Sequence, residues 1–224
     1  MITYISEAFT HGGIWMYAIL GIHIFSIAII IERLYFLYLR RSNNQKKLAK
    51  IFEADIKKGQ IEQAFNRATS LSQSKALGSV AAAGIQAAMN MGGKDEIHAR
   101  MEEMISAENA KLEKRTPLLS MIGNVATLVG LLGTITGMIK SFSAVSMASG
   151  AEKATLLSNG ISEAMNCTAY GLVVAIPALF MYSILSNRTN DLIDDLNQAS
   201  TKVLNWLCYS FENIPGPKSK RRSS

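Results

Sequence analysis

The chain has 224 residues, of which 49% are hydrophobic and 18% are charged, and its formal net charge is +6. This composition is too apolar for an ordinary soluble domain and too charged for a protein made only of membrane spans. The basic residues flank the apolar runs, so the positive charge does not indicate a nucleic-acid-binding protein. Nor does the chain show the motif spacing of a nucleotide, metal or cofactor site, and an enzyme is not expected.

The first apolar run, residues 14–31, is uncharged, and so are residues 117–139 and 164–187. Each run approaches the roughly 20 residues needed to cross a hydrocarbon core of about 30 Å. The sequence therefore predicts three transmembrane helices, the first of which is a retained anchor because no cleavage site follows it. We expect His23 in this first span to make an interhelical hydrogen bond, with a proton-relay role as the alternative.

Between the first two spans, residues 44–91 show apolar positions at helical spacing and predict short amphipathic helices. Gly92 and Gly93 interrupt this pattern. A long helix is expected to follow over residues 94–145, starting with acidic residues suited to a helix N-terminus. Pro117 is expected to kink this helix at the membrane boundary.

The second span contains a stripe of small side chains at alternating spacings of four and three, which place them on one helix face. The stripe comprises Gly123, Thr127, Gly130, Thr134, Gly137, Ser141 and Ala144. A similar set occupies the third span: Gly160, Ala164, Cys167, Thr168, Gly171, Ala175 and Ala178. Such stripes are typical of helices that pack closely or line a narrow polar passage. Thr134 and Thr168 lie near mid-depth, and the alternative for both hydroxyls is a bond to their own backbone.

Basic residues are concentrated after the first span and at the carboxyl end, and the positive-inside rule places both segments in the cytoplasm. The expected fold class is an all-α membrane protein with three transmembrane helices and long cytoplasmic helical extensions. The expected order is a periplasmic N-terminus (1–13), the first span (14–39), a cytoplasmic helical region (40–116), the second span (117–145), a short periplasmic connection (146–158), the third span (159–187), a cytoplasmic helix (188–212) and a flexible basic tail (213–224).

Three segments resemble the ExbB/TolQ/MotA proton-channel family. The second-span segment GLLGTITGMIKSF is similar to the family's GLxGTVxGI segment, and GISEAMNCTAYGLVVAIPALFMY in the third span is similar to GIxEALxxTAxGLxxAIPAxxxY. The first span, GGIWMYAILGIHIFSIAIIIERLYFL, resembles the opening helix. Three spans favour the ExbB/TolQ branch over the four-span MotA branch. Thr127 departs from the family pattern, which often has proline there, and this puts the local pore shape in doubt.

The resemblance implies an ion pathway. Thr134 and Thr168 match the two threonines that face the pore in that family, and Glu163 matches the glutamate one turn before the latter. The residues expected to pack along the pore face are Gly130, Gly137, Ala164, Gly171 and Ala175. Family members assemble as a pentamer around two single-span partners of the ExbD/TolR type, each with a membrane aspartate.

The residues independently indicate such a partner. Proton-driven work needs a group that changes charge inside the membrane, threonine does not titrate near neutrality, and the three spans contain no Asp. Glu163 lies at the outer end of its helix, where it could carry protons at the entrance or be a structural partner of Lys140. For Lys140, we expect a side chain that extends outward to the interface, with a pore-mouth role as the alternative. The switching carboxylate is therefore expected from another chain.

The expected function is the channel-forming subunit of a proton-driven motor in a Gram-negative inner membrane, which energises outer-membrane transport or envelope processes. Expected partners are an ExbD/TolR-like protein, further copies of the chain, membrane lipid and a TonB/TolA-like effector, without cofactors. A gliding-type motility stator and sodium coupling remain open. The alternative from another class is a passive oligomeric membrane scaffold that docks soluble partners.

Overall fold

The computed structural model describes residues 13–40, 45–73 and 75–213, and within these ranges it contains helices and no strands. In chain order they are α2 (Gly13–Leu34), the π-helix η1 (Tyr35–Arg40), α3 (Gln45–Lys57), α4 (Ile61–Ser72), α5 (Ala76–Met89), α6 (Lys94–Glu113), α7 (Thr116–Met147) and α8 (Gly150–Asn213). Three helical stretches are long and apolar enough to span a membrane. The all-helical, three-span prediction is confirmed. The predicted flexible tail beyond residue 213 and most of the predicted periplasmic N-terminus lie outside the described residues.

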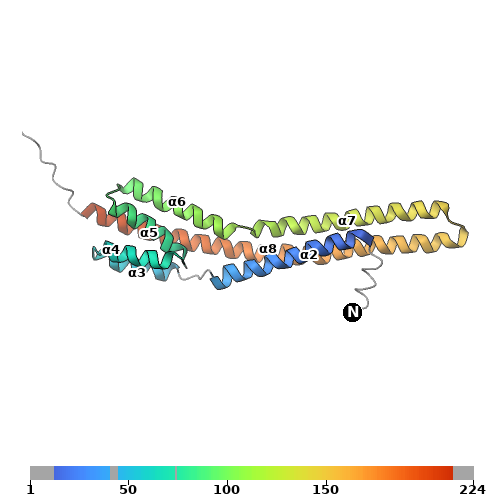
Figure 1. Ribbon diagram of the computed structural model, residues 1–224, viewed down its shortest axis with the longest axis horizontal. Coiled ribbons are helices and arrows are strands. Elements are labelled where there is room, and N and C mark those ends of the chain that lie inside the picture. Colours follow the sequence, from blue (N-terminus) through green and yellow to red (C-terminus); the bar gives the residue numbers. More distant parts are fainter. Residues whose placement is uncertain (1–12, 41–44, 74, 214–224) are drawn as a thin grey trace, which may run out of the picture. The chain divides into compact units, whose positions relative to one another are not determined.

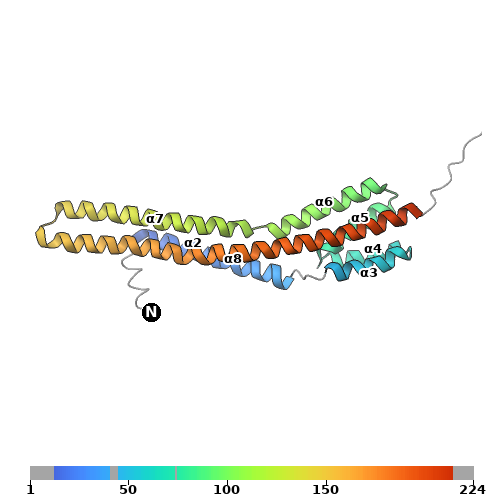
Figure 2. The same ribbon diagram turned by 180° about the vertical axis from the view of Figure 1, so that it is seen from behind.

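The first of two compact units contains α2, α7 and the part of α8 up to Ser186. These three segments lie side by side in Figure 1 and, seen from behind, in Figure 2. Large apolar side chains such as Ile24, Leu128 and Phe180 remain mostly exposed on this unit. A soluble monomer rarely exposes so much apolar surface, which fits contact with lipid or with neighbouring chains.

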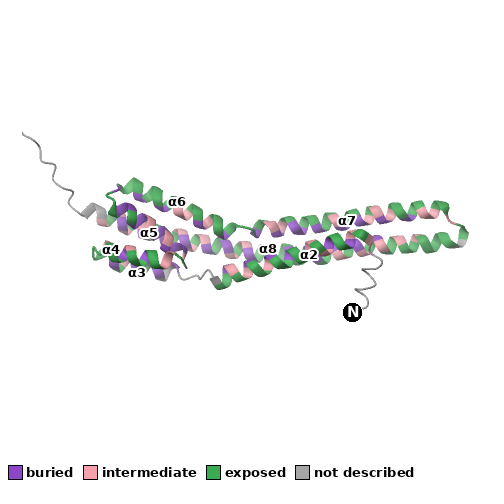
Figure 3. Ribbon diagram, in the orientation of Figure 1, coloured by how far each residue is buried: buried purple, intermediate pink, exposed green. Residues whose placement is uncertain are grey.

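The second unit contains η1, α3 to α6 and the part of α8 from Asn187 onward. Its core is formed by apolar side chains from α3, α4, α5, α6 and α8, including Phe52, Leu77, Ile97 and Leu207. Figure 3 shows α5 coloured mainly as buried, and α5 is also the most Ala-rich helix. The short amphipathic helices predicted over residues 44–91 are confirmed as α3, α4 and α5.

The long helix predicted over residues 94–145 is interrupted, and that prediction is wrong. α6 ends at Glu113, Arg115 adopts a left-handed backbone with φ of 67°, and α7 begins at Thr116. Pro117 occupies the first turn of α7, where its missing N–H is not needed. Within a continuous helix, its ring would clash with the Glu113 carbonyl four residues earlier. The proline therefore starts a new helix instead of kinking an old one.

Only Ala148 and Ser149 separate α7 from α8, so most of residues 146–158 are helical, and the periplasmic location expected for this connection stays a prediction. Ser149 begins α8 by donating its hydroxyl to the Glu152 carboxylate at 3.1 Å, and its carbonyl accepts the Glu152 N–H at 3.0 Å. Ser followed three residues later by Glu is a helix-start pattern. The following Ala, Lys and Leu residues favour helix, so α8 extends well before residue 159.

Candidate functional site

The small-residue faces of α7 and α8 pack against each other. Gly130 and Gly171 lie at the middle of the contact. A Cβ atom on Gly171 would stand 2.8 Å from the Ala126 carbonyl oxygen, and one on Gly130 would stand 3.2 Å from the Cys167 carbonyl oxygen. Distances below 3.0 Å are essentially never seen for real Cβ atoms. The absence of a side chain at Gly171 therefore permits this approach of the two backbones.

The same face continues in both directions along the helix pair. Gly137 packs on Ala164 toward the α7–α8 turn, and Gly123 approaches the carbonyl of Ala175 toward the other end. All five residues predicted to pack along a pore face thus lie buried between two helices of one chain. Their role at a pore stays a prediction, which requires the same helix pair to border the space between chains.

The sequence reasoning missed two members of this face. Ala126 and Gly133 are buried, whereas Thr127 is exposed and Thr134 is half-buried at its edge. A Cβ on Gly133 would stand 2.6 Å from the Cys167 Cβ. The signal was available, because Gly130, Gly133 and Gly137 themselves follow the three-four spacing of a helix face.

Thr168 connects the two helices by a hydrogen bond. Its hydroxyl donates to the Gly130 carbonyl on α7 at 3.1 Å, so the alternative of a bond to its own backbone is wrong for this residue. In the regular pattern of α7, the same carbonyl accepts the backbone N–H of Thr134. The hydroxyl of Thr168 and the main chain of Thr134 thus meet at one oxygen atom.

For Thr134 the alternative, a hydrogen bond to the backbone of its own helix, is present. Its hydroxyl donates to the Leu131 carbonyl at 2.6 Å. Thr127 and Thr136 likewise donate to carbonyls of their own helix. A hydroxyl that donates in this way still has oxygen lone pairs available to a proton donor or an ion. The pathway role of Thr134 stays a prediction.

Glu163 lies next to Lys140, with 3.9 Å between Oε1 and Nζ. Its carboxylate also abuts Gly13, the first residue of α2, where a Cβ would overlap Oε1. Gly13 has a φ of 64°, which disfavours other residues even without the overlap. The structural alternative for Glu163, a pairing with Lys140, is therefore present, and three helices meet at this carboxylate.

Another polar contact joins α2 to α8. The Nδ1 atom of His23 and the hydroxyl of Tyr170 share a hydrogen bond of 3.1 Å, with the two rings at 72° to each other. The predicted interhelical hydrogen bond of His23 is confirmed, and its partner is a residue that the sequence reasoning did not single out. A tyrosine within an apolar span could have indicated it, because a buried phenol usually finds a partner.

We expect His23→Phe and Tyr170→Phe to destabilise the protein through loss of this bond. Hydrogen bonds between membrane helices average about 0.6 kcal/mol and reach about 1.7 kcal/mol, so a coupling in this range is expected. A double-mutant cycle of the free energy of unfolding in detergent measures it. Fully additive effects of the two substitutions would contradict the assignment.

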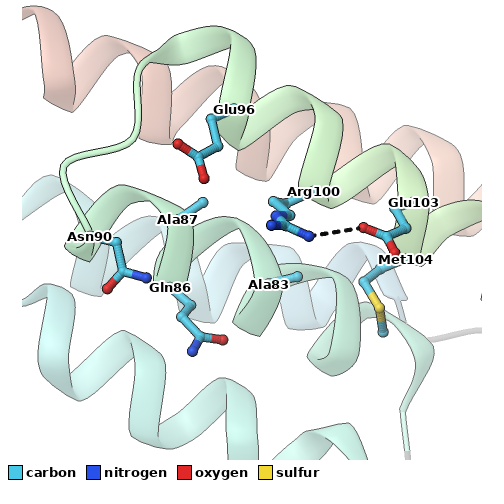
Figure 4. A pocket seen from close by; sticks show the side chains of 8 residues that line it. All are labelled: Ala83, Gln86, Ala87, Asn90, Glu96, Arg100, Glu103 and Met104. Carbon is cyan, nitrogen blue, oxygen red and sulfur yellow. Dashed lines mark hydrogen bonds and ion pairs between the residues drawn. The ribbon is translucent and has the colours of Figure 1, made fainter.

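The second unit contains an open cavity of about 350 Å³ between α5 and α6. Figure 4 shows Gln86 and Asn90 on one side and Glu96, Arg100 and Glu103 on the other, with Arg100 3.3 Å from Glu103. None of its lining residues belongs to the predicted ion pathway. Within the part of the chain that the structure describes, no group of three or more His, Cys, Asp or Glu side chains could hold a metal ion.

Residues 72–198 match the model of the MotA/TolQ/ExbB proton channel family. A putative ExbB-like biopolymer transport protein of Synechocystis is 33% identical over 77% of this chain and 80% of its own length. The biopolymer transport protein ExbB of Pseudomonas putida is 33% identical over 50% of this chain, and the Tol-Pal system protein TolQ of Haemophilus influenzae is 40% identical over 42%.

These last two alignments cover only 34% of the Pseudomonas protein and 41% of the Haemophilus protein. The family match, in contrast, includes both small-residue helices and the residues placed above: Thr134, Glu163 and Thr168. More than half of the chain is matched. The chain therefore belongs to the MotA/TolQ/ExbB proton channel family, within its ExbB/TolQ branch.

Proposed function

We propose that the chain is the channel-forming subunit of an inner-membrane motor driven by the proton-motive force. The observation that carries the proposal is the hydrogen bond from Thr168 to the Gly130 carbonyl, which also serves the Thr134 backbone. It brings together, in the middle of two membrane-length helices, the two residues that match pore-facing threonines. A polar contact of this kind within an apolar span is a functional candidate.

The proton carrier is proposed to be an aspartate on a single-span partner of the ExbD/TolR type. The described spans contain hydroxyls at mid-depth but no Asp, and Glu163 lies five residues from Thr168, about 7.5 Å along the helix. Protonation would neutralise the partner aspartate and release it from the threonine site. Deprotonation to the cytoplasmic side would restore its charge at the next subunit.

The free energy released by one proton is sufficient to drive a conformational step. One proton that crosses a potential of about 150 mV releases roughly 3.5 kcal/mol. That biases a conformational equilibrium by a few hundred-fold. In this proposal several copies of the chain surround the partner helices, and the family resemblance implies five copies. The helix α2 of each copy faces the lipid. The N-terminus is periplasmic and the C-terminus cytoplasmic. A TonB/TolA-like effector passes the work to outer-membrane transport or envelope maintenance.

Proteoliposomes test the proposal directly. The chain is reconstituted alone, with a single-span protein of the ExbD/TolR type that carries a membrane aspartate, or with that partner carrying Asp→Asn. Proton uptake driven by an imposed potential is followed with a pH-sensitive dye. We expect uptake only with the unmodified partner. Equal, background-level uptake in all three preparations would contradict the motor and favour a passive scaffold.

A further inference from the structure

Two charged residues within the described membrane helices lie together near the α7–α8 turn. Lys140 is the only charged residue among residues 116–147, and Glu163 is the only one among residues 154–187. Although they lie on different helices, their charged groups are 3.9 Å apart. The helices already contact each other nearby through Gly137 and Ala164, so neither charged side chain is required for that packing.

The pair lies on one level above the two threonines. α7 and α8 run antiparallel, as the contacts of Gly123 with Ala175 and of Gly137 with Ala164 require. Lys140 is six residues beyond Thr134 toward the turn, or about 9 Å, and Glu163 is about 7.5 Å beyond Thr168 in the same direction. An ion that approaches the threonines from the turn end along α7 and α8 would meet Lys140 and Glu163 first.

Groups from two other helices lie against the Glu163 side chain. Its side chain is 30% exposed, and the backbone of Gly13 abuts its carboxylate. The Lys140 side chain is 65% exposed and places its ammonium group against the same oxygen that abuts Gly13. A metal cation that bound this oxygen would therefore lie within a few ångströms of the ammonium group.

Building on the proposed function, we propose that Lys140 determines ion specificity by excluding Na⁺ from Glu163 while still admitting protons. A proton binds to one carboxylate oxygen through a covalent bond and needs no further ligands. Sodium, a hard cation, needs several oxygen ligands around it. A sodium ion bound at the carboxylate would lie close to the ammonium group, and two cations at such short distance repel each other.

The test compares ion uptake by proteoliposomes that contain the full chain with its single-span partner. Proton uptake is measured with a pH-sensitive dye, in sodium or in N-methylglucamine medium, and sodium uptake is measured with ²²Na⁺. The variants are Lys140→Gln, which removes the charge, and Lys140→Arg, which keeps it. Lys153→Gln is the matched control, because Lys153 is an exposed lysine at the same end of the helix pair.

The unmodified chain and the Lys140→Arg and Lys153→Gln variants are expected to take up protons equally in both media and to exclude ²²Na⁺. Lys140→Gln is expected to take up protons in N-methylglucamine medium. Its ²²Na⁺ uptake should rise roughly tenfold or more, because the cation position at Glu163 is then free. The added substitution Glu163→Gln should abolish this sodium uptake.

Three results would overturn the inference: sodium uptake by the unmodified chain, continued exclusion of sodium by a proton-conducting Lys140→Gln variant, or loss of all conduction in an assembled Lys140→Gln variant. The last would make Lys140 a requirement for conduction. Failure of the proposed function is distinct, since the unmodified chain with its partner would then take up no protons.

Discussion

Thr168→Val is expected to reduce partner-dependent proton uptake to the level of empty liposomes, while the protein still assembles in the membrane. Valine preserves the shape of threonine but cannot donate to the Gly130 carbonyl. That carbonyl keeps its helical partner, the Thr134 N–H, so the structural cost is small. The proposed resting site of the partner aspartate loses its hydroxyl. Thr134→Ala is expected to abolish uptake for the same reason.

The measurement is proton uptake per assembled complex, with the complex quantified by size-exclusion chromatography. Thr168→Ser retains the hydroxyl and should conserve most of the uptake. Thr136→Val is the matched control: it removes a hydroxyl that donates only within its own helix, to Leu132 and Gly133. Normal uptake in both Thr168→Val and Thr134→Ala would refute the pathway assignment.

Gly171→Ala is expected to destabilise the α7–α8 pair by about 1–3 kcal/mol, the usual cost of overpacking. The added methyl group would stand 2.8 Å from the Ala126 carbonyl oxygen and 3.2 Å from the Gly130 Cα. Both neighbours are backbone atoms, which cannot rotate away, so the helices must separate. The hydrogen bond from Thr168 to Gly130 should lengthen with them. The free energy of unfolding in detergent measures the first effect, and proton uptake measures the second.

Gly21→Ala provides the control, because it makes the same substitution in the middle of α2 with no heavy atom of a neighbouring side chain or helix within 4 Å of the new Cβ. Its stability should be unchanged or slightly increased, since alanine favours helix over glycine. Equal stability of Gly171→Ala and Gly21→Ala would show that close packing at Gly171 does not hold the two helices together.

Several features of this protein depend only on local sequence. Hydropathy over windows of about 20 residues predicted the three spans, because crossing a membrane is a property of a continuous segment. Helical periodicity likewise predicted the short helices after the first span, and the small-residue stripes predicted close packing. An error arose at Pro117, where a kink was expected and a new helix starts.

In the candidate site too, local sequence predicted some features, whereas others depend on contacts between helices. The sequence motifs selected Thr134, Glu163 and Thr168 but did not show which atoms these residues contact. Thr134 bonds its own helix, whereas Thr168, with the same side chain, bonds the neighbouring helix. Which bond a hydroxyl makes depends on how far the adjacent backbone lies, and the glycines of two distant segments together determine that distance.

The amino-acid sequence by itself determined the helical class and the number of membrane-length segments, since these follow from composition and periodicity within short stretches, and its motifs indicated the family by resemblance. Only the tertiary structure decided that Lys140 lies near Glu163, that His23 meets Tyr170 and that more than half of the second-span stripe is buried within the chain. These pairings join residues more than 20 positions apart. Their geometry depends on the antiparallel register of the helices, which no single helix contains.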